Sequence, residues 1–182
     1  MSITKQRQQS AYLALAEAFG YTSTMQGPRI EKVIVSTGVG KKRDKKQIEL
    51  IEDRLAKITG QKAAPRAAKT SIASFKVREG DTVGLQVTLR GARMFDFLDK
   101  IIHIALPRTR DFRGLSAGTI DDMGNITIGI KENTIFPETS DEDLKDVFGF
   151  AITIVTTAKS KTEAEAFFRH IGLPIIVEAP KK

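Results

Sequence analysis

The chain has 182 residues and a mass of 20.0 kDa, and its 41% hydrophobic and 28% charged residues indicate a packed core and not wholesale disorder. Cysteine is absent, which excludes a disulfide framework, a thiol nucleophile, a cysteine zinc site and an iron–sulfur cluster. Lys and Arg number 29 against 22 Asp and Glu, and the resulting net charge of +7 favours a polyanionic partner.

Hydrophobic periodicity predicts a helix, a strand and a second helix in the first third of the chain. Residues 3–19 place apolar side chains on one helical face, and residues 29–37 are rich in the β-branched residues typical of a strand. Asp44 stands three residues before Gln47 in a capping-box pattern, and apolar residues then recur at helical spacing up to Gly60.

The strictest alternation in the sequence covers residues 82–90. Apolar residues occupy every second position of this segment, and small or polar residues occupy the positions between them. This pattern predicts a half-buried strand with a hydrogen-bonding outer face. The outer positions are Thr82, Gly84, Gln86, Thr88 and Arg90.

Further elements are predicted in the second half of the chain. A helix with apolar residues on its core side ends before Pro107, and a turn at Gly124-Asn125 leads into a strand. Ser140 begins a cap-like pattern, residues 148–157 form a strand, and Ser160 caps a last helix.

These elements predict an α+β fold, with a mainly antiparallel sheet, helices packed on one face and the other face open. No linker or repeat divides the sequence, so we expect residues 1–182 to form a single domain with a flexible tail over 175–182. The apolar run 11–16 is shorter than a signal-peptide core, and no run approaches the roughly 18 residues that span a bilayer. We therefore expect a cytoplasmic protein without a membrane partner.

The sequence holds no recognisable catalytic constellation. Gly38 and Gly40 follow a strand as in a nucleotide-binding loop, but a dinucleotide fingerprint would need glycine in place of Arg43, and the Walker pattern is missing. His103 and His170 belong to no recognisable metal-ligand cluster and are expected to be structural. We expect no enzyme activity, no cofactor and no metal site.

Basic residues recur through the centre of the chain among small polar residues and glycines. Residues 1–113 carry 22 basic and 11 acidic side chains, a net +11, whereas residues 114–182 carry 7 and 11, a net −4. Arginine pairs with phosphate through two hydrogen bonds, and folded RNA is read largely by its shape, phosphates and 2′-hydroxyls, so the centre favours RNA binding. The central basic residues are Lys62, Arg66, Lys69, Lys76, Arg78, Arg90, Arg93, Arg108, Arg110 and Arg113.

The segment 70–78 (TSIASFKVR) has neither a helical nor a strand period. Ile72 and Phe75 stand among small residues between basic flanks. In one interpretation this is a buried loop with Phe75 in the core. In the other it is a protruding loop that presents an apolar tip and cations to RNA.

Several longer segments, taken together, are characteristic of one protein family. They are PRIEKVIVSTGVG (28–40), ITGQKA (58–63), SIASFKVREG (71–80), VTLRGARMFDFLDKIIHIALPRTRDFRGL (87–115), GNITIGIKENTIFPE (124–138) and ITIVTTAK (152–159). Together, over roughly residues 10–175, they resemble the bacterial large-subunit ribosomal proteins of the L5 family, which bind 5S rRNA.

The resemblance implies an open sheet face that binds 5S rRNA in the central protuberance, beside large-subunit rRNA and other proteins of that region. In this chain the implied rRNA-binding residues are Ser36, Thr37, Gln61, Lys62, Gln86, Thr88, Arg90 and Arg93. The family usually has Asn at the position of Ser36, so this chain lacks one amide side chain that the family's rRNA-binding set contains.

The resemblance also implies a loop that contacts the P-site tRNA and a bridge to a basic protein of the small-subunit head. The implied tRNA-binding residues are Ser71, Ile72, Ala73, Ser74, Phe75, Lys76 and Arg78. The implied bridge residues are Arg108, Arg110, Asp111, Arg113, Asp141, Glu142 and Asp143. Thr70 and Ser74 replace the Lys and Gly usual in the family, which makes the loop less basic and less flexible.

An RNA-directed enzyme is the alternative function. A metal-dependent nuclease would use Asp121, Asp122 and Glu132 as its carboxylates. Incubation of 5S rRNA with the protein and Mg²⁺ separates the two functions, because a binding protein leaves the RNA intact and a nuclease fragments it.

Overall fold

The computed structural model describes residues 2–40, 45–139 and 147–176. The helices are α1 (Ile3–Phe19), α2 (Lys45–Thr59), α3 (Gly91–Lys100), α4 (Leu106–Arg108) and α5 (Lys161–Ile171). The strands are β1 (Ile30–Gly38), β2 (Ala64–Ala67), β3 (Thr82–Leu89), β4 (Leu115–Ser116), β5 (Ile126–Ile130), β6 (Phe150–Thr156) and β7 (Ile175–Ile176). The predicted cap at Asp44 and the helix start at Ser140 lie outside the described residues. None of the described helices has the length and apolar composition needed to cross a membrane.

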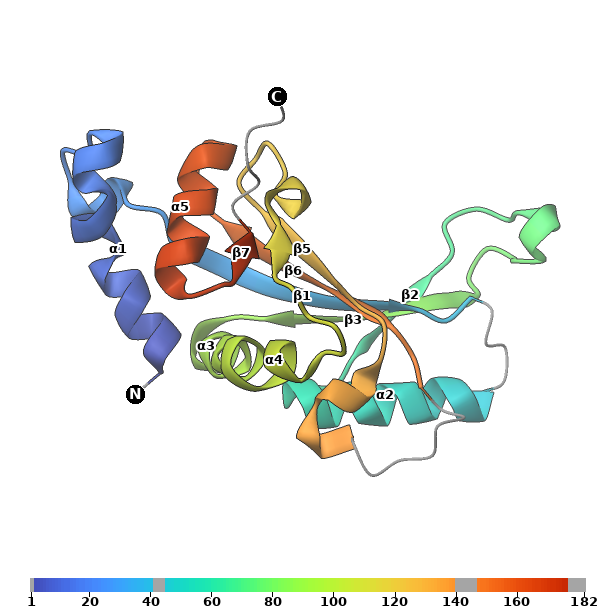
Figure 1. Ribbon diagram of the computed structural model, residues 1–182. Coiled ribbons are helices and arrows are strands. Elements are labelled where there is room, and N and C mark those ends of the chain that lie inside the picture. The colour runs from blue at the N-terminus through green and yellow to red at the C-terminus, as the bar shows by residue number, and fades with distance from the viewer. Residues whose placement is uncertain (1, 41–44, 140–146, 177–182) are drawn as a thin grey trace. The chain divides into compact units, whose positions relative to one another are not determined.

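The main sheet has five strands in the order β2-β3-β1-β6-β5 and is mainly antiparallel, which confirms the predicted α+β class (Figure 1). The short strands β4 and β7 pair in parallel. Two compact units divide the chain: unit 1 comprises residues 1–33, 90–128 and 153–182, and unit 2 comprises residues 34–89 and 129–152. The single domain stays a prediction, and each unit is described by itself.

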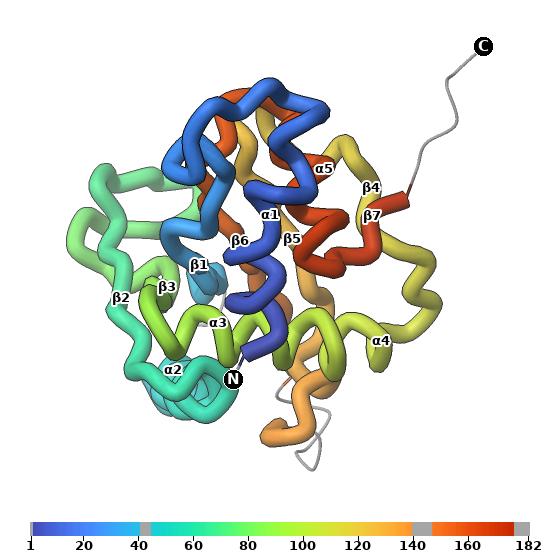
Figure 2. Tube along the Cα trace, turned by 90° about the vertical axis from the view of Figure 1, so that its left-hand side faces the viewer, coloured from blue at the N-terminus to red at the C-terminus, as the bar shows by residue number. Residues whose placement is uncertain are grey.

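In unit 1, helices α1 and α5 lie side by side (Figure 2). The Arg7 guanidinium donates to the carbonyl oxygen of Ile171 at 2.7 Å, where α5 ends and its last carbonyl groups lack helical partners. The Ser10 hydroxyl lies 2.9 Å from Nε2 of His170, which confirms a structural setting for that histidine. Polar contacts along one side of α1 thus fix its position on α5.

The N-terminus of α1 is capped by a carboxylate that is distant in sequence. Asp99 of α3 accepts hydrogen bonds from the backbone N–H groups of Ile3 (3.0 Å) and Thr4 (2.9 Å) and from the Thr4 hydroxyl (2.5 Å). The positive end of a helix dipole favours a negative charge at this place. Burial raises the pKa of Asp99, but the hydrogen bonds from Ser2, Thr4 and Ile3 outweigh it and hold the pKa below its usual 3.8.

The start of α5 confirms the predicted cap by Ser160 with Glu163, whose carboxylate here reaches the residue before the N-cap. The Ser160 hydroxyl accepts from the backbone N–H of Glu163 at 3.3 Å, and the Glu163 carboxylate accepts from the backbone N–H of Lys159 at 2.7 Å. The same carboxylate accepts a hydrogen bond from the Tyr21 hydroxyl. Burial and this acceptor raise the pKa of Tyr21. Glu163 is buried, with 6% of its surface exposed, and these donors satisfy its charge.

The helix predicted to end before Pro107 continues past it, so that expectation is wrong. Residues 101–105 form a wider π-helical turn in which the Leu106 N–H donates to the carbonyl oxygen of Ile101, five residues back. Proline clashes with the carbonyl group four residues before it in a regular helix, and the wider turn changes that spacing. Pro107 is therefore accommodated inside α4.

In unit 2, α2 packs against one face of β3. Alternate residues of β3 are buried, and α2 contributes an apolar face at helical spacing. The buried contributors are Leu85, Val87 and Leu89 from β3 and Ile51, Leu55 and Ile58 from α2. This packing covers one side of β3 and leaves the other half-exposed.

We predict that Asp99→Asn lowers the free energy of unfolding by about 1–2 kcal/mol at pH 7, because it removes the charged acceptor at the start of α1. The pKa of Asp99 is lowered in the folded state, so the stabilisation is complete above pH 3.8 and is lost as the pH falls below that value. Urea denaturation of both proteins should give a difference that shrinks below that pH. Asp96→Asn, an exposed change on the same helix, is the control, and an equal loss there would contradict this role.

Candidate nucleic-acid interface

The half-exposed side of unit 2 is mainly small and polar, with Ile34 of β1 as a larger apolar residue on it. The side chains of Ser36, Gln86 and Thr88 are only partly exposed and point away from the buried residues of β1 and β3. Arg66 of β2 lies on the same side, because β2 and β3 pair antiparallel with Ala64 opposite Gln86 and Arg66 opposite Gly84. We call this surface, made by Ser36, Arg66, Gln86 and Thr88, the polar face.

Thr37 is on the opposite side of β1, which corrects its assignment to the open face. Only 6% of its surface is exposed, and its hydroxyl donates to the carbonyl oxygen of Gly149 at 2.7 Å. Successive residues of a strand point to opposite sides, so Ser36 and Thr37 cannot both face the same partner with their side chains.

Arg66 orients Gln86 on the polar face. Its Nε donates to the Gln86 side-chain oxygen at 2.7 Å. Arginine has no acceptor, so this contact fixes the amide with its oxygen toward Arg66 and its NH₂ group free to donate elsewhere. Within the part of the chain that the structure describes, the terminal nitrogens of Arg66 have no hydrogen-bond partner. The pair thus presents donors from both side chains.

Sequence reasoning placed Arg66 among the central basic residues but not at the rRNA site. All four residues of β2 are exposed, so this strand has no apolar alternation that could have revealed it. Gly84 lies opposite Arg66, and a Cβ there would come within 3.1 Å of the Thr37 carbonyl oxygen. A side chain at position 84 would therefore crowd the backbone of β1 beside Arg66.

Gln61 and Lys62 lie at the margin of the polar face. The Gln61 side-chain nitrogen donates to the backbone oxygen of Thr88 at 3.3 Å, which leaves the amide oxygen as an acceptor. The Lys62 side chain is 85% exposed and forms a 3.4 Å ion pair with Glu52 of α2. Such a surface pair is weak and leaves Lys62 able to reach an anionic partner.

Arg90 and Arg93 belong to unit 1. Arg90 is exposed and occupies the N-cap position of α3, and Arg93 is exposed in the first turn of that helix. Both cations face solvent, as a phosphate contact requires. Their placement next to the polar face stays a prediction.

The segment between β2 and β3 extends beyond the paired strands as a hairpin loop (Figure 1). Ile72 and Val77 exchange backbone hydrogen bonds of 2.9 and 3.2 Å, and the turn between them carries Phe75, which is 71% exposed. The interpretation of a buried loop with Phe75 in the core is therefore wrong. The implied tRNA-binding residues other than these, namely Ser71, Ala73, Ser74, Lys76 and Arg78, are all exposed.

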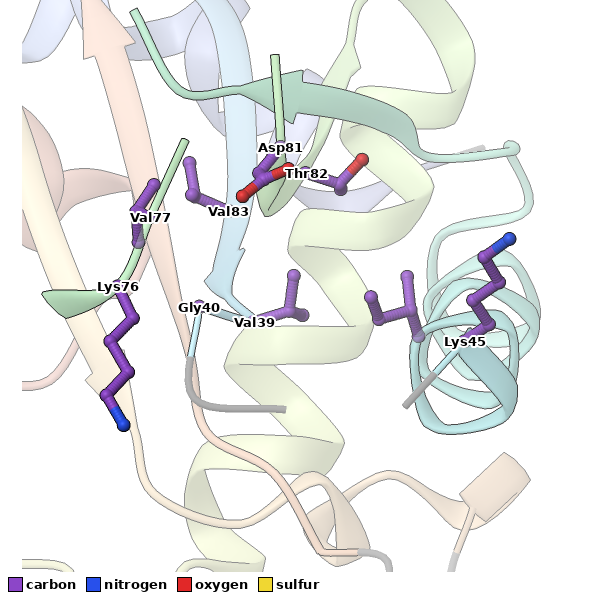
Figure 3. Close-up of a pocket in the computed structure, with 9 residues that line it drawn as sticks. Val39, Gly40, Lys45, Lys76, Val77, Asp81, Thr82 and Val83 are labelled. Carbon is purple, nitrogen blue, oxygen red and sulfur yellow. The ribbon is translucent and has the colours of Figure 1, made fainter. Parts of the chain in front are cut away.

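A hollow of about 340 Å³ lies between the base of this loop and the start of α2 (Figure 3). Val39, Gly40 and Val83 line its floor, and Lys45 and Lys76 stand at its edges. The two ammonium groups point away from each other, on opposite sides of the hollow. Convergent cations and backbone donors are what a nucleotide phosphate needs, so this geometry does not favour a nucleotide site.

The candidate bridge residues that the structure describes lie in unit 1, in α4 and the turn after it. Arg108, Arg110, Asp111 and Arg113 are all exposed, and Asp111 has a positive φ of 54°. Asp141, Glu142 and Asp143 lie outside the described residues. The described part of the candidate bridge is therefore mainly cationic.

Within the described parts of the chain, no three His, Asp or Glu residues lie together so that they could hold a metal ion. The carboxylates of the nuclease alternative, Asp121, Asp122 and Glu132, therefore form no metal site there. Asp121 instead closes its own turn, accepting from the backbone N–H (2.6 Å) and the side-chain amide (3.0 Å) of Asn125. Burial raises the pKa of Asp121, but these hydrogen bonds outweigh burial and hold the pKa below its usual value.

Two family models match the chain in sequence order. The model for ribosomal protein L5 matches residues 23–78, and the model for the C-terminus of the ribosomal L5 family matches residues 82–175. Three relatives, each named large ribosomal subunit protein uL5, come from Ureaplasma urealyticum serovar 10, Flavobacterium johnsoniae and Mycoplasma pneumoniae.

The first of these relatives is 48% identical over 161 residues, the second 49% over 162 and the third 47% over 163. The alignments cover 88%, 88% and 89% of this chain and 88%, 88% and 91% of the relatives. Proteins so named are structural and not enzymatic, which removes the nuclease alternative. With both models matched and nearly half of the aligned residues identical, this chain belongs to the ribosomal protein L5 family.

Proposed function

We propose that this chain, a structural component of the large ribosomal subunit, binds 5S rRNA in the central protuberance through the polar face of unit 2. The observation that carries this proposal is the Arg66–Gln86 pair on a strand face that also holds Ser36 and Thr88. Large-subunit rRNA and neighbouring protuberance proteins complete its partners. Its place is then on the ribosome, in the cytoplasm.

The chemistry of the polar face suits the backbone of folded RNA. Arg66 offers a planar set of donors that matches a phosphate, and the Gln86 NH₂ group and the Ser36 hydroxyl can reach phosphate oxygens or riboses. The Gln61 amide oxygen can accept from a 2′-hydroxyl, which DNA lacks. Small side chains on both strands allow an RNA strand to approach the sheet closely.

We predict that Arg66→Ala weakens 5S rRNA binding and lowers the slope of log affinity against log salt by about one unit, since it removes one cation that pairs with phosphate. Gln86→Ala should weaken binding with no change in that slope. The double variant should lose less than the two single losses added together, because Arg66 holds the Gln86 amide in place. Filter binding or gel shifts across a salt series measure all three.

Lys57→Gln is the matched control for the Arg66 variant. Lys57 lies on α2, where it pairs with Asp53 at 2.9 Å, and its side chain is 52% exposed. The substitution removes one positive charge from unit 2 away from the polar face. Equal effects of Arg66→Ala and Lys57→Gln on affinity would mean that net charge, and not the polar face, sets the binding.

The loop between β2 and β3 is proposed to contact the P-site tRNA. Lys76 and Arg78 can neutralise only a couple of phosphates, so such a contact is weak, salt-sensitive and independent of sequence. The exposed position of residues 71–76 supports this role, because exposed side chains are open to a partner.

We predict that deleting residues 72–76 leaves the thermal unfolding midpoint and the 5S rRNA affinity of the chain nearly unchanged, because the removed residues are exposed. Ribosomes that carry the shortened chain should hold P-site tRNA less tightly. Melting curves, 5S rRNA gel shifts and tRNA dissociation from assembled ribosomes test the three parts. A deletion that unfolds the chain, or that leaves tRNA retention intact, would contradict the assignment.

The third proposed contact is a bridge to a basic protein of the small-subunit head. Like charges would repel Arg108, Arg110 and Arg113 from such a protein, so the attraction must come from acidic residues of the C-terminal part, which carries net −4 over 114–182. Asp141, Glu142 and Asp143 supply a cluster of suitable charge in the sequence.

We predict that amine cross-linking of whole ribosomes joins Lys145, which is next to that acidic cluster in sequence, to a protein of the small-subunit head. Phosphate repulsion should keep this acidic segment away from 5S rRNA. Mass spectrometry of the cross-linked peptides identifies the partner. Recovery of Lys145 mainly on 5S rRNA would overturn the bridge.

A further inference from the structure

The tip of the β2–β3 loop exposes an aromatic ring to solvent. Phe75 is 71% exposed and Ile72, in the same loop, is 45% exposed. Exposing a phenylalanine forgoes the stabilisation that burial of its ring would give. A ring at the end of a protruding loop is therefore better explained by a partner than by folding.

The loop holds this ring in a defined position. The Ile72–Val77 backbone pair closes the hairpin, and the Lys76 N–H donates to the carbonyl oxygen of Ala73 at 3.0 Å. Lys76 itself has φ 52° and ψ 36°, a left-handed conformation that is unfavourable for a residue with a side chain. Phe75 is thus presented on a fixed turn.

An apolar hollow of about 700 Å³ opens beside the ring. Gly38, Gly40, Ala68 and Val83 contribute to its walls together with Phe75 and Ile72. Among the residues that the structure describes, Lys69 is the charged residue in its lining, and the adjoining hollow adds Lys45, Lys76 and the carboxylate of Asp81. The Asp81 carboxylate accepts from the backbone N–H of Arg78 at 2.9 Å. The surroundings of the ring are therefore apolar with a cationic rim.

These features fit an unpaired base within an RNA strand better than they fit a free nucleotide or a protein. A nucleotide combines a flat apolar base with an anionic phosphate, which matches a ring beside lysines. A specific protein interface needs about 800 Å² from each partner, far more than Phe75 and Ile72 offer. The small lining residues also leave room for a base but supply few anchors for a protein.

We propose that Phe75 stacks on an unpaired base of the RNA that this loop contacts, with the lysines near the phosphates of the same strand. This inference rests on the proposed tRNA contact and adds its mode of binding. Stacking is possible with any base, so it strengthens the contact without making it specific for sequence. It also adds affinity that does not depend on salt.

Ribosomes assembled with Phe75 variants and deacylated tRNA in the P site test this proposal. Phe75→Ala should weaken tRNA binding about 5- to 150-fold, the usual range for one stacked base, with an unchanged salt slope. Phe75→Leu should show a similar loss because it keeps an apolar side chain without a ring. Phe75→Trp should restore binding, and Lys76→Gln should instead lower the salt slope by about one unit.

The outcomes separate this inference from the function on which it rests. If Phe75→Ala binds tRNA with wild-type affinity, the ring does not stack and the inference is overturned. If only Phe75→Leu binds with wild-type affinity, the contact needs an apolar side chain and not a ring, which also overturns stacking. If Lys76→Gln and the deletion of 72–76 still weaken tRNA binding, the proposed tRNA contact remains supported although the stacking inference has failed. If the deletion has no effect either, the proposed tRNA contact itself is wrong. Melting curves of each variant control for folding, which an exposed side chain should not alter.

Discussion

The two sides of the sheet in unit 2 have opposite chemistry because the residues of a strand point alternately to its two faces. Leu85, Val87 and Leu89 of β3 are buried, and α2 packs on that strand, whereas Gln86 and Thr88 are left on the half-exposed side. A slip of one residue in register would bury an amide and a hydroxyl and expose the apolar side chains. The proposed RNA-binding surface therefore depends on the same alternation that makes the core.

Local patterns predicted the elements that local interactions determine. The alternation over 82–90 predicted β3 and both of its faces, and the Ser160–Glu163 cap predicted the start of α5. In each case the residues that decide the structure are neighbours in sequence. The family resemblance then supplied the partners, which composition alone limited only to polyanions.

Contacts between distant residues could not be predicted in this way. Asp99 caps α1 from 95 residues or more away in sequence, and nothing in the sequence around Ser2 indicates that acceptor. Thr37 was misplaced although the buried Val33 and Val35 lie at alternate positions before it in the same strand, which would have placed it inside. Arg66 was missed at the site because β2 forms through pairing with β3 and is exposed along its whole length.

The polar face and the β2–β3 loop would hold RNA by different physical means. The polar face combines one guanidinium with neutral donors and acceptors whose directions are fixed by neighbours, as Arg66 fixes Gln86. Several oriented hydrogen bonds of this kind tolerate little displacement, which suits a partner that stays bound. The loop offers a few cations and one ring on a turn whose residues 71–76 are all exposed. A contact that small is lost at low cost, as a tRNA that leaves in every cycle requires, because no buried group loses a partner when the RNA departs.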